Sequence, residues 1–197
     1  MSKVVYSVLF IVACTSAPLE TSEVTNALNP TSLCPASVPS KLTAALPAGQ
    51  ELKAAYSARG YQIYKCSPTT TGGYAWVFQY PSADLLDQNG NVVGTHFIGP
   101  TWQFHDGSSV KGAKIAAAQP DLTAIPWLVL KAIANTDSPD GDGRFADITY
   151  VQRLSTVGGN APADGCDATH AGDMANVDYT ANYFFYHLGD NDSRRCQ

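Results

Sequence analysis

Two histidines lie close together in the middle of the chain, in the segment from Gly94 to Gly112. His96 precedes a Gly-Pro pair, and His105 precedes Asp106. A histidine on a strand beside aromatic residues can act as a general base or contact a ligand, because its ring titrates near neutral pH. The simpler interpretation is a histidine that is half-buried and bonded to the backbone, and we favour it. Two histidines without a third ligand are weak evidence for a metal site.

Aromatic residues around this segment suggest a second kind of chemistry. Aromatic side chains in sugar-binding modules stack on the apolar faces of sugars. Trp102, beside the Gly-Pro pair, is the main candidate for such a contact, and Tyr64 is another. We expect Trp76 and Trp127 to lie in the core instead.

Arg153 lies on a segment that alternates between apolar and polar residues. An arginine on a partly apolar face usually pairs with a carboxylate, and Asp84, Asp106 and Asp147 are candidates for that partner. Alternatively, Arg153 orients the carboxylate of a ligand. The candidate ligand-binding residues are therefore His96, Trp102, Tyr64 and Arg153.

Several classes of function lack their sequence motifs. The chain has no phosphate-binding P-loop, no H-E-x-x-H and no G-x-S-x-G. We therefore predict no catalytic residue, no metal and no cofactor, and we lean against an enzyme. The net charge is −5, and Arg194-Arg195 is the largest basic cluster. Such a surface argues against a nucleic-acid partner, because binding to phosphates needs a basic face.

The first residues have the pattern of an export signal. Lys3 is followed by an apolar run from Val4 to Ala13 and by small residues up to Ala17, and the run is too short to span a bilayer. Either a peptidase cuts near Ala17, or Cys14 lies in a lipobox and is acylated. Residues 1–17 are thus predicted to direct the chain out of the cytoplasm. The mature protein would be secreted or lipid-anchored to the envelope at Cys14.

The cysteine count fits an oxidising compartment. The chain has five cysteines, and setting Cys14 aside leaves an even number for pairing. Three pairings are possible, and we favour Cys66–Cys166 within the domain and Cys34–Cys196 between the two tails. No pair has the C-x-x-C spacing of a redox motif.

The composition of the chain changes at Glu51, where strand-forming residues begin. Residues 18–50 are rich in Ser, Thr and Pro and are predicted to form a tether and an irregular lead-in with a helical turn at 40–45. Residues 51–188 form the predicted domain, and residues 189–197 form a tail. Asn89-Gly90 marks a hairpin between 84 and 97, because it tolerates the positive φ of a tight turn. A second hairpin is predicted around 105–108.

The remaining strand signals are short. We expect one strand to end at Arg59-Gly60, a second over 61–66, a third that ends at Pro81, and others over 127–134, 145–156 and 177–188. Roughly eight to ten short strands at this spacing indicate an all-β domain. The predicted fold is an antiparallel β-sandwich or barrel-like sandwich.

Several motifs occur in a fixed order between about residues 46 and 186. They include GxHFxGPTW at 94–102, IPWL at 125–128, VQRLxTxGGxAP at 151–162 and YxAxYxFY at 179–186. This ordered set resembles the domain-of-unknown-function 3455 family of exported bacterial and fungal proteins. Some fungal members carry the label malate dehydrogenase, but this chain lacks the Gly-rich turn between strand and helix that seats a nicotinamide cofactor.

Three hypotheses about function follow. The first is an exported, non-catalytic module that binds an extracellular or envelope ligand such as carbohydrate. The second is a small hydrolase or metal-dependent enzyme that uses His96 with His105 or Arg153. The third is a structural envelope or matrix protein that assembles through its strand edges. The oligomeric state is left open.

Overall fold

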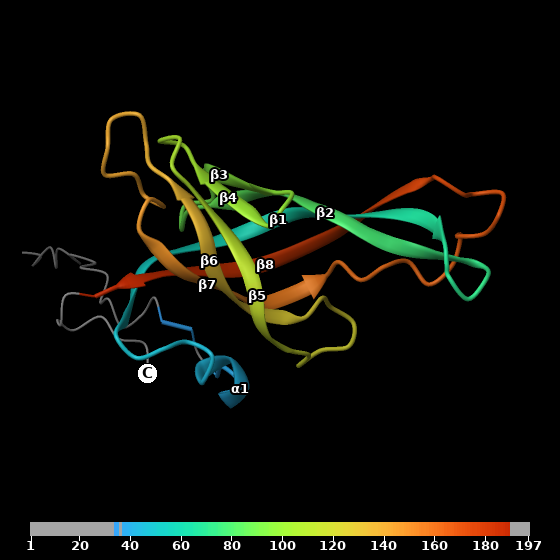
Figure 1. The fold of residues 1–197 in the computed structure, drawn as a ribbon, viewed down its shortest axis with the longest axis horizontal. Helices are drawn as coiled ribbons and strands as arrows, with labels where there is room; N and C mark the ends of the chain where they lie inside the picture. Colours follow the sequence, from blue (N-terminus) through green and yellow to red (C-terminus); the bar gives the residue numbers. More distant parts are fainter. Residues whose placement is uncertain (1–33, 36, 190–197) are drawn as a thin grey trace, which may run out of the picture.

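Eight antiparallel strands form a closed barrel in the computed structural model, which describes residues 34, 35 and 37–189. Each strand pairs with the next along the chain, and the last pairs with the first (Figure 1). A one-turn helix, α1 (Ser40–Thr43), precedes the barrel. The strands are β1 (Gln50–Pro68), β2 (Tyr74–Leu86), β3 (Val92–Phe97), β4 (Thr101–Phe104), β5 (Ser109–Ala118), β6 (Trp127–Thr136), β7 (Ile148–Gly158) and β8 (Met174–Leu188).

The predicted all-β, antiparallel fold class is confirmed, and the sheet is a single ring. Both predicted hairpins are present, as are the predicted strand at 127–134 and the helical turn near residue 40. No helix among the described residues is long and apolar enough to cross a membrane.

The prediction of two strands on either side of Gly60 was wrong, because β1 is continuous there. A Cβ atom on Gly60 would lie 2.2 Å from the carbonyl oxygen of Ser82 in β2. Gly60 therefore allows two backbones to approach closely within the sheet, which is a common use of glycine inside a strand.

The prediction that Pro81 ends its strand was also wrong. Pro81 pairs with Gln62 of β1, and β2 continues to Leu86. The pairing of β2 with β3 begins only at Ala83. On that side Pro81 therefore lies on a free edge, where the missing backbone N–H removes no ladder hydrogen bond.

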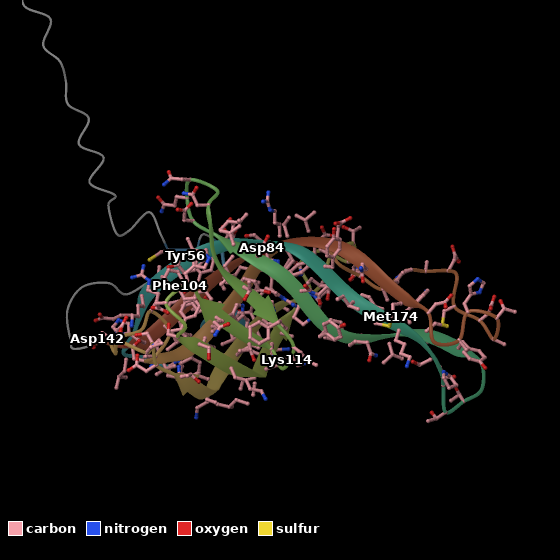
Figure 2. The ribbon with its side chains drawn as sticks, turned by 90° about the horizontal axis from the view of Figure 1, so that it is seen from above. Tyr56, Asp84, Phe104, Lys114, Asp142 and Met174 are labelled. Atoms are coloured by element: carbon pink, nitrogen blue, oxygen red, sulfur yellow. A yellow bond between two sulfur atoms is a disulfide. The ribbon has the colours of Figure 1, made fainter. Side chains whose placement is uncertain are left out.

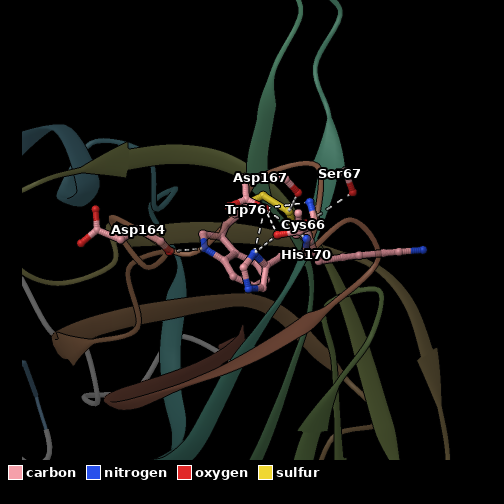
Figure 3. Close-up of a disulfide and its surroundings, with 9 residues drawn as sticks. Cys66, Ser67, Trp76, Asp164, Asp167 and His170 are labelled. Carbon is pink, nitrogen blue, oxygen red and sulfur yellow. Dashed lines mark hydrogen bonds and ion pairs between the residues drawn. A yellow bond between two sulfur atoms is a disulfide. The ribbon is translucent and has the colours of Figure 1, made fainter.

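Three strands are longer than the rest and project beyond the barrel as an arm. β1, β2 and β8 continue together to the side away from α1 (Figure 1). A disulfide joins Cys66 near the end of β1 to Cys166 in the β7–β8 loop, so this predicted pair is confirmed. Trp76 lies beside the disulfide (Figure 3), and its Nε1 donates a hydrogen bond to the carbonyl oxygen of Asp164 at 2.8 Å.

Of the second predicted disulfide pair, Cys34–Cys196, the structure describes only Cys34. Cys34 is disulfide-bonded. Its predicted partner Cys196, the predicted signal over 1–17 and the acylation site Cys14 lie outside the described residues. The Cys66–Cys166 bond alone indicates an oxidising, extracytoplasmic environment.

Aromatic side chains fill the barrel at the end where β6 leads into β7. Phe145 is fully buried there and stacks on Phe185 with ring centroids 4.4 Å apart. Tyr56 and Phe104 pack against Phe145, and Figure 2 places both at the end opposite Met174 of the arm. The Ser108 hydroxyl accepts a hydrogen bond from the Phe145 N–H at 2.9 Å, which holds the Phe145 backbone against the β4–β5 turn. This end of the barrel is therefore closed.

A second cluster covers the outside of the sheet. Leu42 of α1 is fully buried and belongs to a cluster with Val129, Leu154 and Tyr186 from the outer face. Successive residues in β8 therefore serve different layers, with Phe185 inside the barrel and Tyr186 outside it. The helical turn just before β1 thus packs on the outer face of the barrel, while residues 18–33 of the predicted tether lie outside the described residues.

Replacing both Cys66 and Cys166 by serine is expected to destabilise the protein. The bond closes a loop with a sequence separation of 100 residues, for which the chain-entropy model gives about 4 to 5 kcal/mol. We expect the urea midpoint to fall accordingly, while Ser67→Ala beside it leaves the midpoint nearly unchanged. An unchanged midpoint in the double variant would contradict this role.

Candidate functional site

A cavity of about 500 Å³ opens at the end of the barrel opposite Phe145. All eight strands contribute residues to its wall, together with the β3–β4 turn and the β5–β6 loop. The volume falls in the usual range for small-molecule sites, roughly 300 to 1,000 Å³. Most of the wall is apolar or aromatic, with Leu128, Leu130 and Ile125 among the aliphatic residues.

The four candidate ligand-binding residues all line this cavity. They come from four different strands, and they are Tyr64 of β1, His96 of β3, Trp102 of β4 and Arg153 of β7. Adjacent strands bring His96 and Trp102 into register as direct partners. The barrel thus brings together residues up to about ninety positions apart in the sequence, from 64 to 153.

His96 is buried, with 3% of its surface exposed. Its Nδ1 lies 2.9 Å from the carbonyl oxygen of Thr101, and because a carbonyl only accepts, Nδ1 carries the proton. Burial lowers the pKa of His96 to about 3, and nearby Arg153 lowers it further, against the opposing effect of the Thr101 bond. The ring is therefore neutral at physiological pH. This is the backbone-bonded arrangement that we favoured, with the ring more deeply buried than predicted.

Trp102 is an interior residue, with 1% of its surface exposed. The His96 ring covers one face of the indole, with ring centroids 4.4 Å apart and planes inclined by 6°. Tyr183 and Phe185 meet Trp102 edge-on. The exposed aromatic platform that we expected for sugar binding is thus not formed by Trp102.

The expectation that Trp76 lies in the core was wrong, because Trp76 is less buried than predicted. Trp76 lies on the arm and is only partly buried, because β2 has left the barrel at that point. Trp127 is also only partly buried, and it packs against the cluster on the outer face of the sheet.

Arg153 is held by the backbone. Its Nε and Nη2 donate hydrogen bonds to the carbonyl oxygen of Pro126 at 3.1 and 2.8 Å. The acidic partner that we predicted is absent among residues 34, 35 and 37–189, where no ion pair involves Arg153.

Two of the predicted partners are engaged elsewhere. Asp106 accepts hydrogen bonds from the Ser108 hydroxyl and the Arg144 N–H at the closed end. Asp147 pairs with Lys53 and His187. These two acids are thus engaged away from the cavity, and no ion pair gives Arg153 a counter-charge from the described residues.

Tyr64 forms the side of the cavity nearest the arm. Its hydroxyl donates a hydrogen bond to the carbonyl oxygen of Gly159 at 2.6 Å, and burial raises its pKa. The ring of Phe78 meets Tyr64 edge-on with centroids 5.7 Å apart. Phe78 is 47% exposed and lines the cavity, so it forms part of the rim.

Most residues of the wall were missed in the sequence, and three with polar side chains matter for its chemistry. They are Gln62, Lys114 and Tyr183. Gln62 could have been found, because residues two apart on a strand share a face and Tyr64 was already a candidate. The β-bulge opposite Ile63 and Tyr64 places the consecutive residues Phe78, Gln79 and Tyr80 all at the cavity, and strand alternation alone does not predict that.

Two buried donors of the wall lack a partner. Trp102 Nε1 and Gln62 Nε2 make no hydrogen bond within the described part of the chain, although Gln62 lies near the Tyr179 hydroxyl. A buried donor without an acceptor costs roughly 1 to 3 kcal/mol. Both atoms are fully buried, so they lie behind the cavity surface.

The charged groups that line the cavity are all of one sign. Its wall offers N–H donors and two cations, Arg153 and Lys114, and no Asp or Glu of the described residues lines it. His105 is not in the wall, so it does not join His96 there. Within the described ranges no group of three or more His, Cys, Asp or Glu is arranged to hold a metal ion. The arrangement suits the binding of an electron-rich group more than acid–base chemistry.

Comparison with known proteins gives one match. A family model described as protein of unknown function (DUF3455) matches residues 47–187. No curated protein and no solved structure matches the chain.

Protonation of His96 is expected to unfold the protein at low pH. The pKa of about 3 in the folded state lies below the usual 6.5, so the unfolded state binds the proton more readily. This contribution to stability is complete above pH 6.5 and is lost as the pH falls towards 3, with a slope of up to about 1.4 kcal/mol per pH unit. We expect His96→Asn, whose amide can donate to Thr101 in place of Nδ1, to reduce the fall in Tm between pH 7 and pH 4. Equal falls in both proteins would contradict the assignment.

Proposed function

Because this chain belongs to the DUF3455 family of proteins of unknown function, its role has to be inferred from its own cavity, and we propose that it binds a small, largely apolar molecule without catalysis. The observation that carries the proposal is the difference between the two ends of the barrel. Aromatic rings fill one end, and a cavity of about 500 Å³ with an apolar wall occupies the other.

An eight-stranded barrel supports this interpretation by its size. Its interior is just wide enough either to be filled by side chains or to hold one small ligand. In this barrel the filled half is fixed by Phe145 and its neighbours, while the half lined by Leu128 and Leu130 remains open to a ligand. An apolar wall favours burial of an apolar molecule by about 25 cal/mol per Å² removed from water.

The enzyme hypothesis receives less support from the site. A general base works best with a pKa near the operating pH. The pKa of His96 is lowered to about 3, and its Nδ1 proton is engaged with Thr101. No carboxylate of the described residues is in the wall to assist it. A binding role needs none of these groups to titrate.

The same wall fits a carbohydrate ligand less well than an apolar one. A sugar needs an accessible aromatic face and partners for many hydroxyls. Trp102 is covered by His96, and most of the surface that the wall exposes is apolar. An apolar body with a few acceptors therefore fits better than a glycan. We propose that binding takes place outside the cytoplasm, in line with the Cys66–Cys166 bond.

Filling the cavity tests the proposal. Leu130 lines the cavity and is 2% exposed, and Ile133 on the same strand is 59% exposed. We expect Leu130→Trp to weaken binding of the fluorescent probe 1-anilinonaphthalene-8-sulfonate at least tenfold, and Ile133→Trp to leave it unchanged. Leu128→Trp serves as a second filling variant if Leu130→Trp fails to fold, as judged by circular dichroism.

A ligand screen completes the test. We expect small apolar molecules to raise the Tm of the wild-type chain, because a ligand that binds only the folded state stabilises it. The Leu130→Trp variant should lose those shifts. Shifts with glycans alone, or equal probe binding by both tryptophan variants, would overturn the proposal.

A further inference from the structure

The cavity combines an apolar body with unpaired positive charge. Arg153 lies in its wall and Lys114 at its exposed rim, and neither forms an ion pair with any described residue. Figure 2 shows Lys114 along the flank of the barrel, between the closed end at Phe104 and the arm. Although the net charge of the protein is −5, the charged side chains that line this cavity are all positive among the described residues.

The guanidinium of Arg153 is oriented and only partly used. Two of its five N–H donors point at the Pro126 carbonyl oxygen, which fixes the plane of the group. Of the three remaining N–H groups, one lies within reach of the Tyr183 hydroxyl, where burial raises the pKa of Tyr183 and the contact with Arg153 lowers it. A partly buried cation without an anion is unfavourable, and a planar guanidinium matches a carboxylate with two parallel hydrogen bonds.

Buried donors lie beside this cation. Gln62 and Trp102 are 3% and 1% exposed and line the cavity with Arg153; Gln62 lies near the Tyr179 hydroxyl, and Trp102 Nε1 makes no hydrogen bond within the described part of the chain. His96 stays neutral, so it adds no charge to oppose or assist an anion. Donors and cations therefore gather in one wall, while the aliphatic residues Leu128, Leu130 and Ile125 supply the rest.

We infer that the ligand is a hydrophobic monocarboxylic acid, an inference that rests on the proposed binding function. Arg153 holds the carboxylate, and the apolar body of the acid lies against Leu128 and Leu130. A phosphate ester or a sugar acid is a poorer fit, because its additional polar groups would be buried against aliphatic side chains without partners. The acid binds without any covalent step.

A matched pair of ligands tests this inference. Decanoate and 1-decanol share a chain and differ in the head group, so their affinities isolate the carboxylate. We expect the disulfide-bonded wild-type chain to bind decanoate at least tenfold more tightly than 1-decanol by isothermal titration calorimetry at pH 7.5. In Arg153→Gln that preference is expected to vanish, because the affinity for decanoate falls to about that for 1-decanol.

Two further variants separate charge from geometry. Arg153→Lys keeps the charge but loses the planar fork, and it is expected to retain a reduced preference for decanoate. Lys131→Gln removes one positive charge from an exposed position of β6 outside the cavity wall and should behave as wild type. Lys114→Gln at the rim is expected to have a smaller effect than Arg153→Gln, because solvent screens an exposed charge.

The outcomes distinguish the two proposals. If the wild-type chain binds neither decanoate nor 1-decanol, the binding function itself is overturned. Equal affinity for both ligands would leave the cavity as an apolar site and would overturn the carboxylate inference. A preference for decanoate that survives in Arg153→Gln would overturn the role of Arg153.

Discussion

The pairing of β1 with β8 is the constraint on which the rest of this structure depends. It runs from Gln50 opposite Leu188 to Lys65 opposite Met174, so it joins the two ends of the domain along nearly the whole of β1. Closure of the ring gives the interior a size set by strand number, which the side chains must fill or leave open. The Cys66–Cys166 bond lies just beyond the same strand pair, at the arm, and shortens the search for this long-range contact in the unfolded chain.

The two halves of the interior are built by different means. At the closed end the loop that carries Phe145 is tied down by hydrogen bonds from its backbone to Asp106 and Ser108, so that a bulky ring is held in the centre. At the open end the loop that carries Pro126 instead fixes Arg153 at the side of the cavity. The loop that carries Phe145 thus fills the barrel interior with an aromatic ring. The loop that carries Pro126 holds the charge of Arg153 beside the open cavity.

Local signals in the sequence predicted local structure well. Asn89-Gly90 identified its hairpin because the turn needs a positive φ, and Gly90 supplies it with a φ of 81°. Gly60 misled the strand prediction because its requirement comes from Ser82, a residue of the neighbouring strand. Trp76 and Trp102 were assigned to the wrong environments for a similar reason. Burial depends on where each strand leaves the barrel, and no short window of sequence contains that information.

The candidate site was predicted in its residues more than in its chemistry. His96, Trp102, Tyr64 and Arg153 do meet, because each faces inward on its strand. The sequence did not show which partners the acidic side chains have in the folded domain. Asp87 and Asp121 accept hydrogen bonds within their own turns, from Asn91 and Thr123 respectively, and these bonds lower the pKa of each carboxyl group. Asp87 and Asp121 are thus engaged in their own turns, and the positive character of the wall comes from Arg153 and Lys114, with no Asp or Glu of the described residues beside them.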